Sequence, residues 1–202
     1  MTRPDLDRGN RRFAEEGYLF GEGPNRFLTS QATALPPGRA LCVADGEGRN
    51  GVWLAEQGWQ VVSLDFSDVA QHKAADLAAR RGVTLDLVQA DVHGWDYPPA
   101  AFDLVADIFS QFSAPDDRAR KWNGMARALR PGGYLILQGY TADQLRHGTG
   151  GPRELAQLYT DDMLRGAFPD FDILHLEATE TVLDEGPGHS GLSAVIGLLA
   201  RC

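Results

Sequence analysis

Apolar residues in the middle of the chain form short runs that alternate with stretches of helical periodicity. Short apolar runs bounded by turn residues are typical of buried strands, whereas apolar residues that return every three or four positions indicate a helix. The runs predict strands at about 39–44, 60–65, 84–89, 102–108 and 134–139. Helices are expected at about 50–58, 67–81 and 115–129. This alternation predicts an α/β fold with a doubly wound, mostly parallel sheet.

The pattern changes after the fifth predicted strand. A glycine-rich excursion at 148–152 precedes a helical stretch at about 153–166. Two further strands are expected at about 171–181 and 190–200, which brings the sheet to seven strands. Only a short turn separates these two strands, so they should pair as an antiparallel C-terminal hairpin.

The first 38 residues are predicted to form an N-terminal arm. Polar and charged residues dominate it, with Phe13, Tyr18 and Phe20 embedded among them, and Asn25 is placed to cap a short helix. The arm is either a loose surface extension or a lid whose aromatic side chains cover a site. With 202 residues we expect one domain, made of the arm (1–38), a core (39–140), an excursion with a helix (141–170) and the hairpin (171–202).

Charge and composition narrow the possible partners. Nineteen basic and 28 acidic residues give a net charge of −9, which disfavours binding to a nucleic-acid backbone. No apolar run is long enough to span a membrane, and the N-terminus has no signal-peptide pattern. Two cysteines fit a reducing compartment, and the five histidines show no metal-ligand spacing. We therefore expect a cytoplasmic protein without metal, either a monomer or a weak homodimer.

A glycine-rich loop follows the first strand. Gly46, Gly48 and Gly51 form a Gly-x-Gly-x-x-Gly pattern between a predicted strand and a predicted helix, the context in which this pattern indicates a nucleotide-type ligand. Asp65 ends the second strand, where a carboxylate can bind the two hydroxyls of a ribose. Asp91 ends the third strand, where it can meet an exocyclic amine. Ligands of such sheets bind outside the carboxyl ends of the strands.

These residues resemble those of a known enzyme family. The segments 46–50, 102–105 and 129–133, together with Asp65 and Asp91, are similar to those of class I S-adenosylmethionine-dependent methyltransferases, nearest the small tellurite-resistance TehB-like branch. The resemblance implies a Rossmann-like methyltransferase fold over one methyltransferase domain. It also implies S-adenosylmethionine as cofactor, S-adenosylhomocysteine as product and methyl transfer to a small-molecule acceptor.

The resemblance assigns roles to individual residues. Asp65 would bind the ribose hydroxyls, Phe66 would lie against the adenine, and Asp91 would take the adenine amino group with Val92 beside the ring. The full set expected to bind the cofactor is Ala44, Asp45, Gly46, Gly48, Asn50, Asp65, Phe66, Asp91, Val92 and Asp107.

The loop departs from the family pattern at two positions. Aligned on Gly46 and Gly48, the places of the usual acid and first glycine hold Cys42 and Ala44. The acid that often contacts the methionine portion of the cofactor is therefore missing. Either Asp45 or Glu47 compensates, or the contact is lost.

Methyl transfer to an oxygen or nitrogen nucleophile can require a base within hydrogen-bond reach. The candidates by position are Asp107, Tyr140 and His147.

Two other functions fit the same motifs. The Gly-x-Gly-x-x-Gly loop with Asp65 also suits an NAD(P)-dependent oxidoreductase, although the 130–133 turn and the terminal hairpin count against it. The altered first motif also leaves open a non-catalytic S-adenosylmethionine-binding protein.

Overall fold

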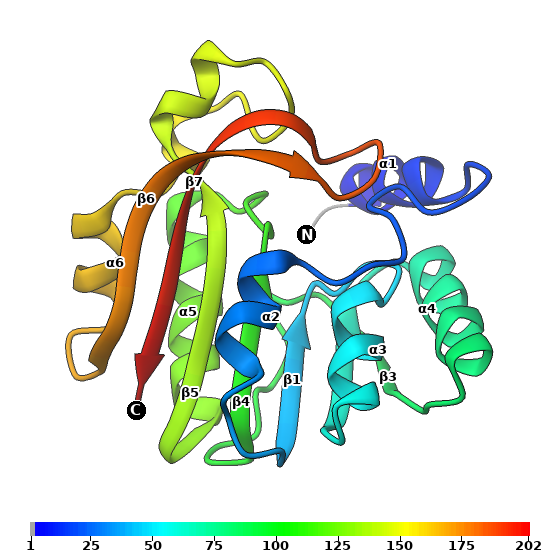
Figure 1. The fold of residues 1–202 in the computed structure, drawn as a ribbon, viewed down its shortest axis with the longest axis horizontal. Helices are drawn as coiled ribbons and strands as arrows, with labels where there is room; N and C mark the ends of the chain where they lie inside the picture. Colours follow the sequence, from blue (N-terminus) through cyan, green and yellow to red (C-terminus); the bar gives the residue numbers. More distant parts are fainter. Residues whose placement is uncertain (1–2) are drawn as a thin grey trace.

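The computed structural model describes residues 3–202, without the side chains of residues 3–6 and 8. Its centre is a seven-stranded sheet with the order β3-β2-β1-β4-β5-β7-β6 (Figure 1). The strands are β1 (Arg39–Val43), β2 (Gln60–Asp65), β3 (Asp86–Gln89), β4 (Phe102–Ile108), β5 (Leu129–Tyr140), β6 (Asp172–Asp184) and β7 (Ser190–Arg201). β1 to β5 pair in parallel, and β7 pairs antiparallel with both β5 and β6. The fold class and the terminal hairpin are confirmed.

Helices cover both faces of the sheet. They are α1 (Arg3–Phe13), α2 (Arg26–Ala32), α3 (Arg49–Glu56), α4 (Asp68–Arg81), α5 (Pro115–Ala128) and α6 (Asp161–Ala167), with 3-10 turns η1 (Ala142–Arg146) and η2 (Leu155–Gln157). Successive strand side chains point to opposite faces, so β1 serves both layers. Leu41 packs with Trp122 of α5 on one face, and Cys42 packs with Leu54 of α3 on the other. Cys42 is thus a buried core side chain.

Two boundaries differ from the prediction. The single helix expected at 153–166 is wrong: η2 and α6 occupy its ends, and Tyr159 between them is extended. The Tyr159 N–H donates to the Tyr140 carbonyl at 2.9 Å, and its ring packs 5.2 Å from that of Trp122, so tertiary contacts override the helical periodicity. The predicted turn before the fifth strand lies inside β5. Leu129 already pairs with Phe102, and the pairing resumes at Tyr134 after an irregular register.

The N-terminal arm packs against the carboxyl ends of the strands. Residues 3–13 form α1, which the sequence pattern did not predict. Asn10 of this helix binds Asp68 and Ser67 at the start of α4, and Asn25 caps α2 as expected. The β6–β7 hairpin curves over the same edge toward the arm (Figure 1). The arm and the hairpin therefore enclose this edge from above.

Over residues 3–202, none of the helices combines the length and the apolar character that crossing a bilayer requires.

A glycine pair tests how closely α3 and α4 are packed. Gly48 and Gly82 both have positive φ, but a Cβ on Gly48 would lie 2.6 Å from the Ala74 Cβ, whereas a Cβ on Gly82 meets no atom within 4 Å. We expect Gly82→Ala to lower the free energy of unfolding by about 1 kcal/mol, through backbone strain alone. Gly48→Ala should cost about 2–4 kcal/mol because overpacking adds to the strain. Denaturant unfolding measures both, and equal costs would contradict the close packing.

Candidate functional site

The loop after β1 makes a tight turn over the edge of the sheet. Ala44, Gly46 and Gly48 all have positive φ, at 52°, 57° and 83°. Glycine adopts this region freely, whereas an alanine there is strained by about 1–2 kcal/mol. Ala44 therefore adopts a backbone conformation that favours glycine. Backbone strain of this kind concentrates at functional sites.

Asp65 fixes this loop from below. Its side chain is buried, with one carboxylate oxygen accepting the Gly46 N–H and the other the Ser67 N–H, each at 2.9 Å. Burial raises the pKa of this carboxyl above its ordinary value. An ionised carboxylate offers about four acceptor positions, so these bonds do not use up its capacity. Asp65 can thus hold the loop and still accept from a pair of hydroxyls.

Helix α1 covers the outer side of the loop. A Cβ on Gly9 would lie 2.8 Å from the Phe66 Cζ, which shows how closely the helix backbone approaches this half-buried ring. A Cβ on Gly46 would lie 3.6 Å from the ring of Phe13. Phe66, which follows β2, and the loop at Gly46 therefore lie beneath the N-terminal arm.

The side chains of Asp91 and Val92 lie in different surroundings. One Asp91 oxygen accepts the His93 N–H at 3.0 Å and lies 3.0 Å from the His93 ring Nδ1. Val92 is buried in the core on the α5 side, and its carbonyl accepts the Tyr97 hydroxyl at 2.9 Å. Asp91 thus stays at the edge of the sheet, whereas the Val92 side chain belongs to the core.

Neither acid of the loop offers an unpaired carboxylate. Asp45 accepts from the Ser63 hydroxyl at 2.8 Å and the Gly51 N–H at 3.3 Å. Burial raises the pKa of Asp45 to about 7. Glu47 pairs with Lys73 at 3.0 Å and accepts the Phe20 N–H at 3.4 Å. Both acids stabilise the loop and its neighbours.

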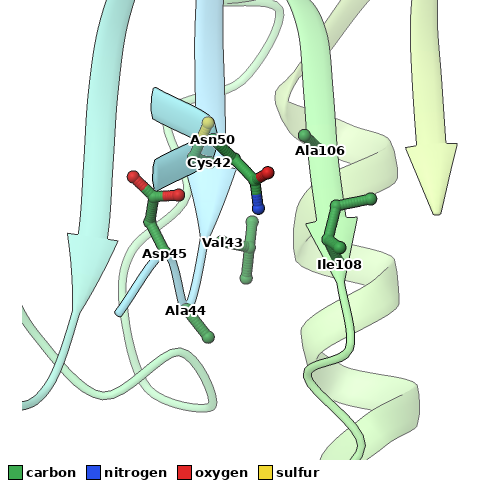
Figure 2. Close-up of a pocket in the computed structure, with 7 residues that line it drawn as sticks. All are labelled: Cys42, Val43, Ala44, Asp45, Asn50, Ala106 and Ile108. Carbon is green, nitrogen blue, oxygen red and sulfur yellow. The ribbon is translucent and has the colours of Figure 1, made fainter. Parts of the chain in front are cut away.

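A small cavity lies where β1 and β4 end. Its volume of about 10 Å³ suits a single water molecule. Figure 2 shows Asn50 reaching toward Val43, between the strand of Cys42 and that of Ala106 and Ile108. The lining residues are Cys42, Val43, Ala44, Asp45, Asn50, Ala106 and Ile108.

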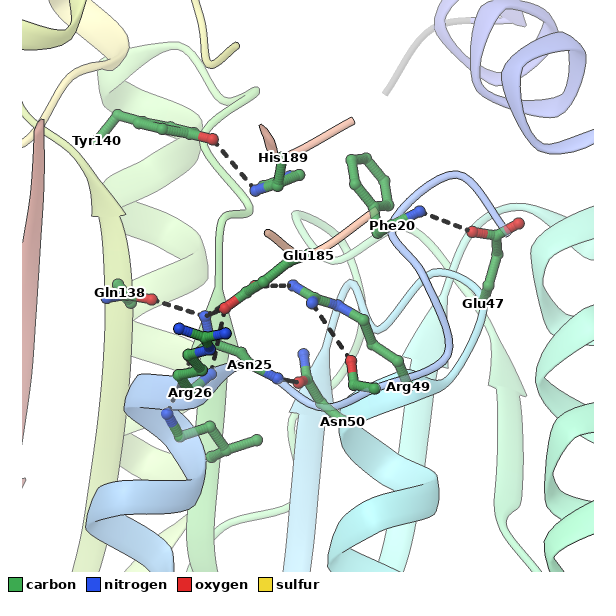
Figure 3. Close-up of polar contacts among 12 residues, drawn as sticks. Phe20, Asn25, Arg26, Glu47, Arg49, Asn50, Gln138, Tyr140, Glu185 and His189 are labelled. Carbon is green, nitrogen blue, oxygen red and sulfur yellow. Dashed lines mark hydrogen bonds and ion pairs between the residues drawn. The ribbon is translucent and has the colours of Figure 1, made fainter. Parts of the chain in front are cut away.

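A buried polar network continues from Asn50 (Figure 3). The Asn50 side-chain oxygen accepts the Asn25 N–H at 2.9 Å, and the Asn25 amide donates to Gln138 at 2.7 Å. Asn25 also donates to Glu185, which forms an ion pair with Arg49 at 2.8 Å. No sequence motif singles out Glu185, because the turn between the last two strands gives only a hairpin signal.

An aromatic cluster adjoins this network. The Tyr140 hydroxyl lies 3.2 Å from the His189 Nδ1, and the rings of Phe20 and Phe109 lie 4.5 Å and 4.4 Å from that of His189. Burial, with the positive charges of Arg49 and Arg12, lowers the pKa of His189 to about 3. Burial also raises the pKa of Tyr140. Both side chains are therefore neutral over the physiological pH range.

The three candidate bases have different surroundings. Asp107 forms a buried ion pair with Lys121 at 3.1 Å and accepts from Trp122 and Ser110, so its carboxylate is fully engaged. His147 pairs with Glu180 of β6 at 2.9 Å, on the excursion. Tyr140 is the candidate that lies in the aromatic cluster. Among the described residues no group of three or more His, Cys, Asp or Glu side chains is placed to hold a metal ion.

Comparison with known proteins agrees with this geometry. Residues 40–133 match the model of the methyltransferase domain family. The chain is 28% identical over 140 residues to a demethylmenaquinone methyltransferase of Renibacterium salmoninarum, covering 69% of this chain and 54% of that protein. It is 32% identical over 136 residues to thiocyanate methyltransferase 1 of Brassica oleracea, covering 66% and 59%. The chain thus spans about half the length of the curated relatives it matches.

Solved structures share the fold. One, described for the conversion of a disulfide bond into a thioacetal group during echinomycin biosynthesis, superposes with a TM-score of 0.75 at 23% identity over 96% of this chain and 86% of that chain. TehB from Haemophilus influenzae gives 0.71 at 18% identity over 86% and 60%. TehB is one of several neighbours, so the expected special nearness to its branch is not supported. Residues 40–133 therefore resemble a methyltransferase domain, and the seven-stranded sheet has the Rossmann-like methyltransferase fold.

The buried carboxyl of Asp45 predicts a pH dependence of stability. In the unfolded chain it loses its proton near pH 3.8, whereas the folded chain holds the proton until about pH 7. Ionisation above pH 3.8 is thus penalised in the folded state, and the free energy of unfolding falls as pH rises through this range. Asp45→Asn cannot titrate, so the wild-type chain should lose about 2–3 kcal/mol relative to this variant between pH 5 and pH 7.5. Denaturant unfolding at both pH values checks this, and parallel pH profiles would contradict it.

Proposed function

We propose that the protein transfers a methyl group from S-adenosylmethionine to a small-molecule acceptor. The observation that carries the proposal is the buried Asp65 carboxylate at the end of β2, bonded to the Gly46 N–H of the strained loop after β1. This arrangement joins the two elements that bind a nucleoside in such sheets. It lies within the residues that match the methyltransferase domain.

The residues at this edge fit the cofactor. Asp65 has acceptor positions left for the ribose hydroxyls, and Phe66 beside it offers a ring for the adenine. Asp91 at the end of β3 is suited to the adenine amino group. The loop residues Ala44, Gly46 and Gly48 place backbone close to the ligand, and Asn50 lines the cavity beside them. Because the Val92 side chain is in the core and Asp107 is paired with Lys121, we give these two only a supporting role.

When bound, S-adenosylmethionine supplies the methyl group and a neutral thioether leaving group, so the chain has mainly to align the acceptor and exclude water. The arm and the β6–β7 turn close over the edge of the sheet and keep water out. The Gly188 N–H donates to the Leu19 carbonyl at 2.8 Å, which joins the two segments. Tyr140 and His189 are neutral hydrogen-bonding groups that can orient an acceptor in the aromatic cluster.

The acceptor that we propose is a small molecule. Tyr140 packs against Phe109 after β4, and Phe109 and Phe20 of the arm both pack against His189 of the β6–β7 turn. Such an enclosed cluster suits a compact acceptor better than a macromolecular one. Two relatives are named for thiocyanate and demethylmenaquinone, both small molecules. A TehB-like acceptor has no stronger support than these.

Asp65→Asn tests the ribose role. The variant keeps the side-chain size and one acceptor but loses the charge, so we expect binding of S-adenosylhomocysteine to weaken by about 10- to 100-fold. Asp86→Asn is the matched control, because Asp86 is exposed at the opposite end of β3. Calorimetric titration of both variants decides the matter, and unchanged affinity in a folded Asp65→Asn protein would refute the ribose assignment.

Catalysis is tested separately from binding. The protein is incubated with methyl-labelled S-adenosylmethionine and a panel of thiocyanate, small thiols and phenols, and transfer of label is measured. We expect label on at least one of these acceptors and less transfer by Tyr140→Phe. Tight cofactor binding without transfer to any of them would favour the non-catalytic alternative, which the altered first motif keeps open.

A further inference from the structure

An ion pair is buried beside the loop after β1. Arg49, the first residue of α3, contacts Glu185 of the β6–β7 turn at 2.8 Å, and their side chains are 7% and 4% exposed. A buried ion pair brings little net stability, because both groups lose their hydration. Its place next to the loop therefore suggests a role beyond holding the fold together.

Two other groups hold the Glu185 carboxylate in position. The Asn25 amide lies 3.1 Å from each carboxylate oxygen, and the Arg26 N–H donates to one of them at 3.2 Å. Asn25 is itself fixed by Asn50 and Gln138 (Figure 3). The carboxylate is thus oriented from several elements before any ligand binds.

The acid that the family pattern places at the end of β1 is missing in this chain. Cys42 occupies the place of that acid and is buried in the core. Asp45 is engaged by Ser63 and Gly51, and Glu47 by Lys73. Both compensating candidates in the loop thus already have partners of their own. The acid that forms an ion pair with Arg49 of α3 is Glu185, from the β6–β7 turn.

We propose that Arg49 and Glu185 bind the amino-acid end of S-adenosylmethionine, with Arg49 taking the carboxylate and Glu185 the ammonium group. The inference rests on the proposed function. A zwitterion placed between the two side chains gives each buried charge a partner of opposite sign. A simple anion would leave Glu185 unpaired, and a simple cation would leave Arg49 unpaired, each at the cost of a buried uncompensated charge.

The test compares two ligands in calorimetric titration. S-adenosylhomocysteine carries the amino-acid end, and 5′-methylthioadenosine lacks it. Glu185→Gln and Arg49→Gln should each weaken binding of S-adenosylhomocysteine by about 10- to 100-fold, because one charge-assisted contact is lost. Binding of 5′-methylthioadenosine should change by less than about threefold, because this ligand lacks the groups that the two side chains would contact. Glu47→Gln, which removes another buried acid of the same region, should not discriminate between the ligands.

Several outcomes would overturn the proposal. Equal weakening of both ligands by Glu185→Gln would show a purely structural role. A selective loss in Glu47→Gln instead would assign the ammonium to Glu47. A wild-type chain that binds neither ligand would refute the proposed function itself, which separates that failure from a failure of this inference.

A measurement on the wild-type chain keeps the proposal testable if the variants do not fold. S-adenosylhomocysteine is compared with its deaminated analogue, which keeps the carboxylate and lacks the ammonium group. We expect the analogue to bind about 10- to 100-fold more weakly. Equal affinity for the two would overturn the role of Glu185.

Discussion

The site depends on one buried carboxylate. Asp65 ends β2, holds the loop after β1 through the Gly46 N–H, and accepts the Ser67 N–H at the start of α4. Burial of this carboxyl disfavours its charged form, so the two backbone hydrogen bonds are what makes an ionised acid tolerable there. The same bonds set the direction in which the loop leaves the sheet. This loop lies at the edge where ligands of such sheets bind.

The upper wall of the site comes from the two ends of the chain. The arm supplies Phe13, Phe20 and Asn25, and the β6–β7 turn supplies Glu185 and His189. Backbone contact between Leu19 and Gly188 joins them, and the buried pair of Arg49 and Glu185 ties the turn to α3. Charged groups at this edge are therefore paired before any ligand binds. A ligand that enters must offer charges of both signs to replace those contacts.

The fold was largely predictable because it follows from local patterns. Short apolar runs and turn residues placed the strands closely, and Asn25 caps α2 as its residue type predicts. The predictions failed where tertiary contacts decide the outcome. Tyr159 is extended because its N–H pairs with Tyr140 and its ring packs on Trp122, although the surrounding sequence has helical periodicity.

The candidate site was predictable only in part, for the same reason. The loop and Asp65 follow from a contiguous motif, and their positions agree with the expected edge. Which acids are engaged could not be read from the sequence: Asp107 meets Lys121, Asp45 meets Ser63, and Glu185 meets Arg49 only after the chain folds. His189, which reads as an ordinary surface histidine, is buried between aromatic rings because the hairpin curves over the sheet.

The central claim is that this edge binds a nucleoside sulfonium and not a dinucleotide. The direct measurement is calorimetric titration of the wild-type chain with S-adenosylhomocysteine and, separately, with NADH. The account predicts saturable one-to-one binding of S-adenosylhomocysteine and no measurable heat of binding for NADH. Saturable binding of NADH without binding of S-adenosylhomocysteine would contradict it.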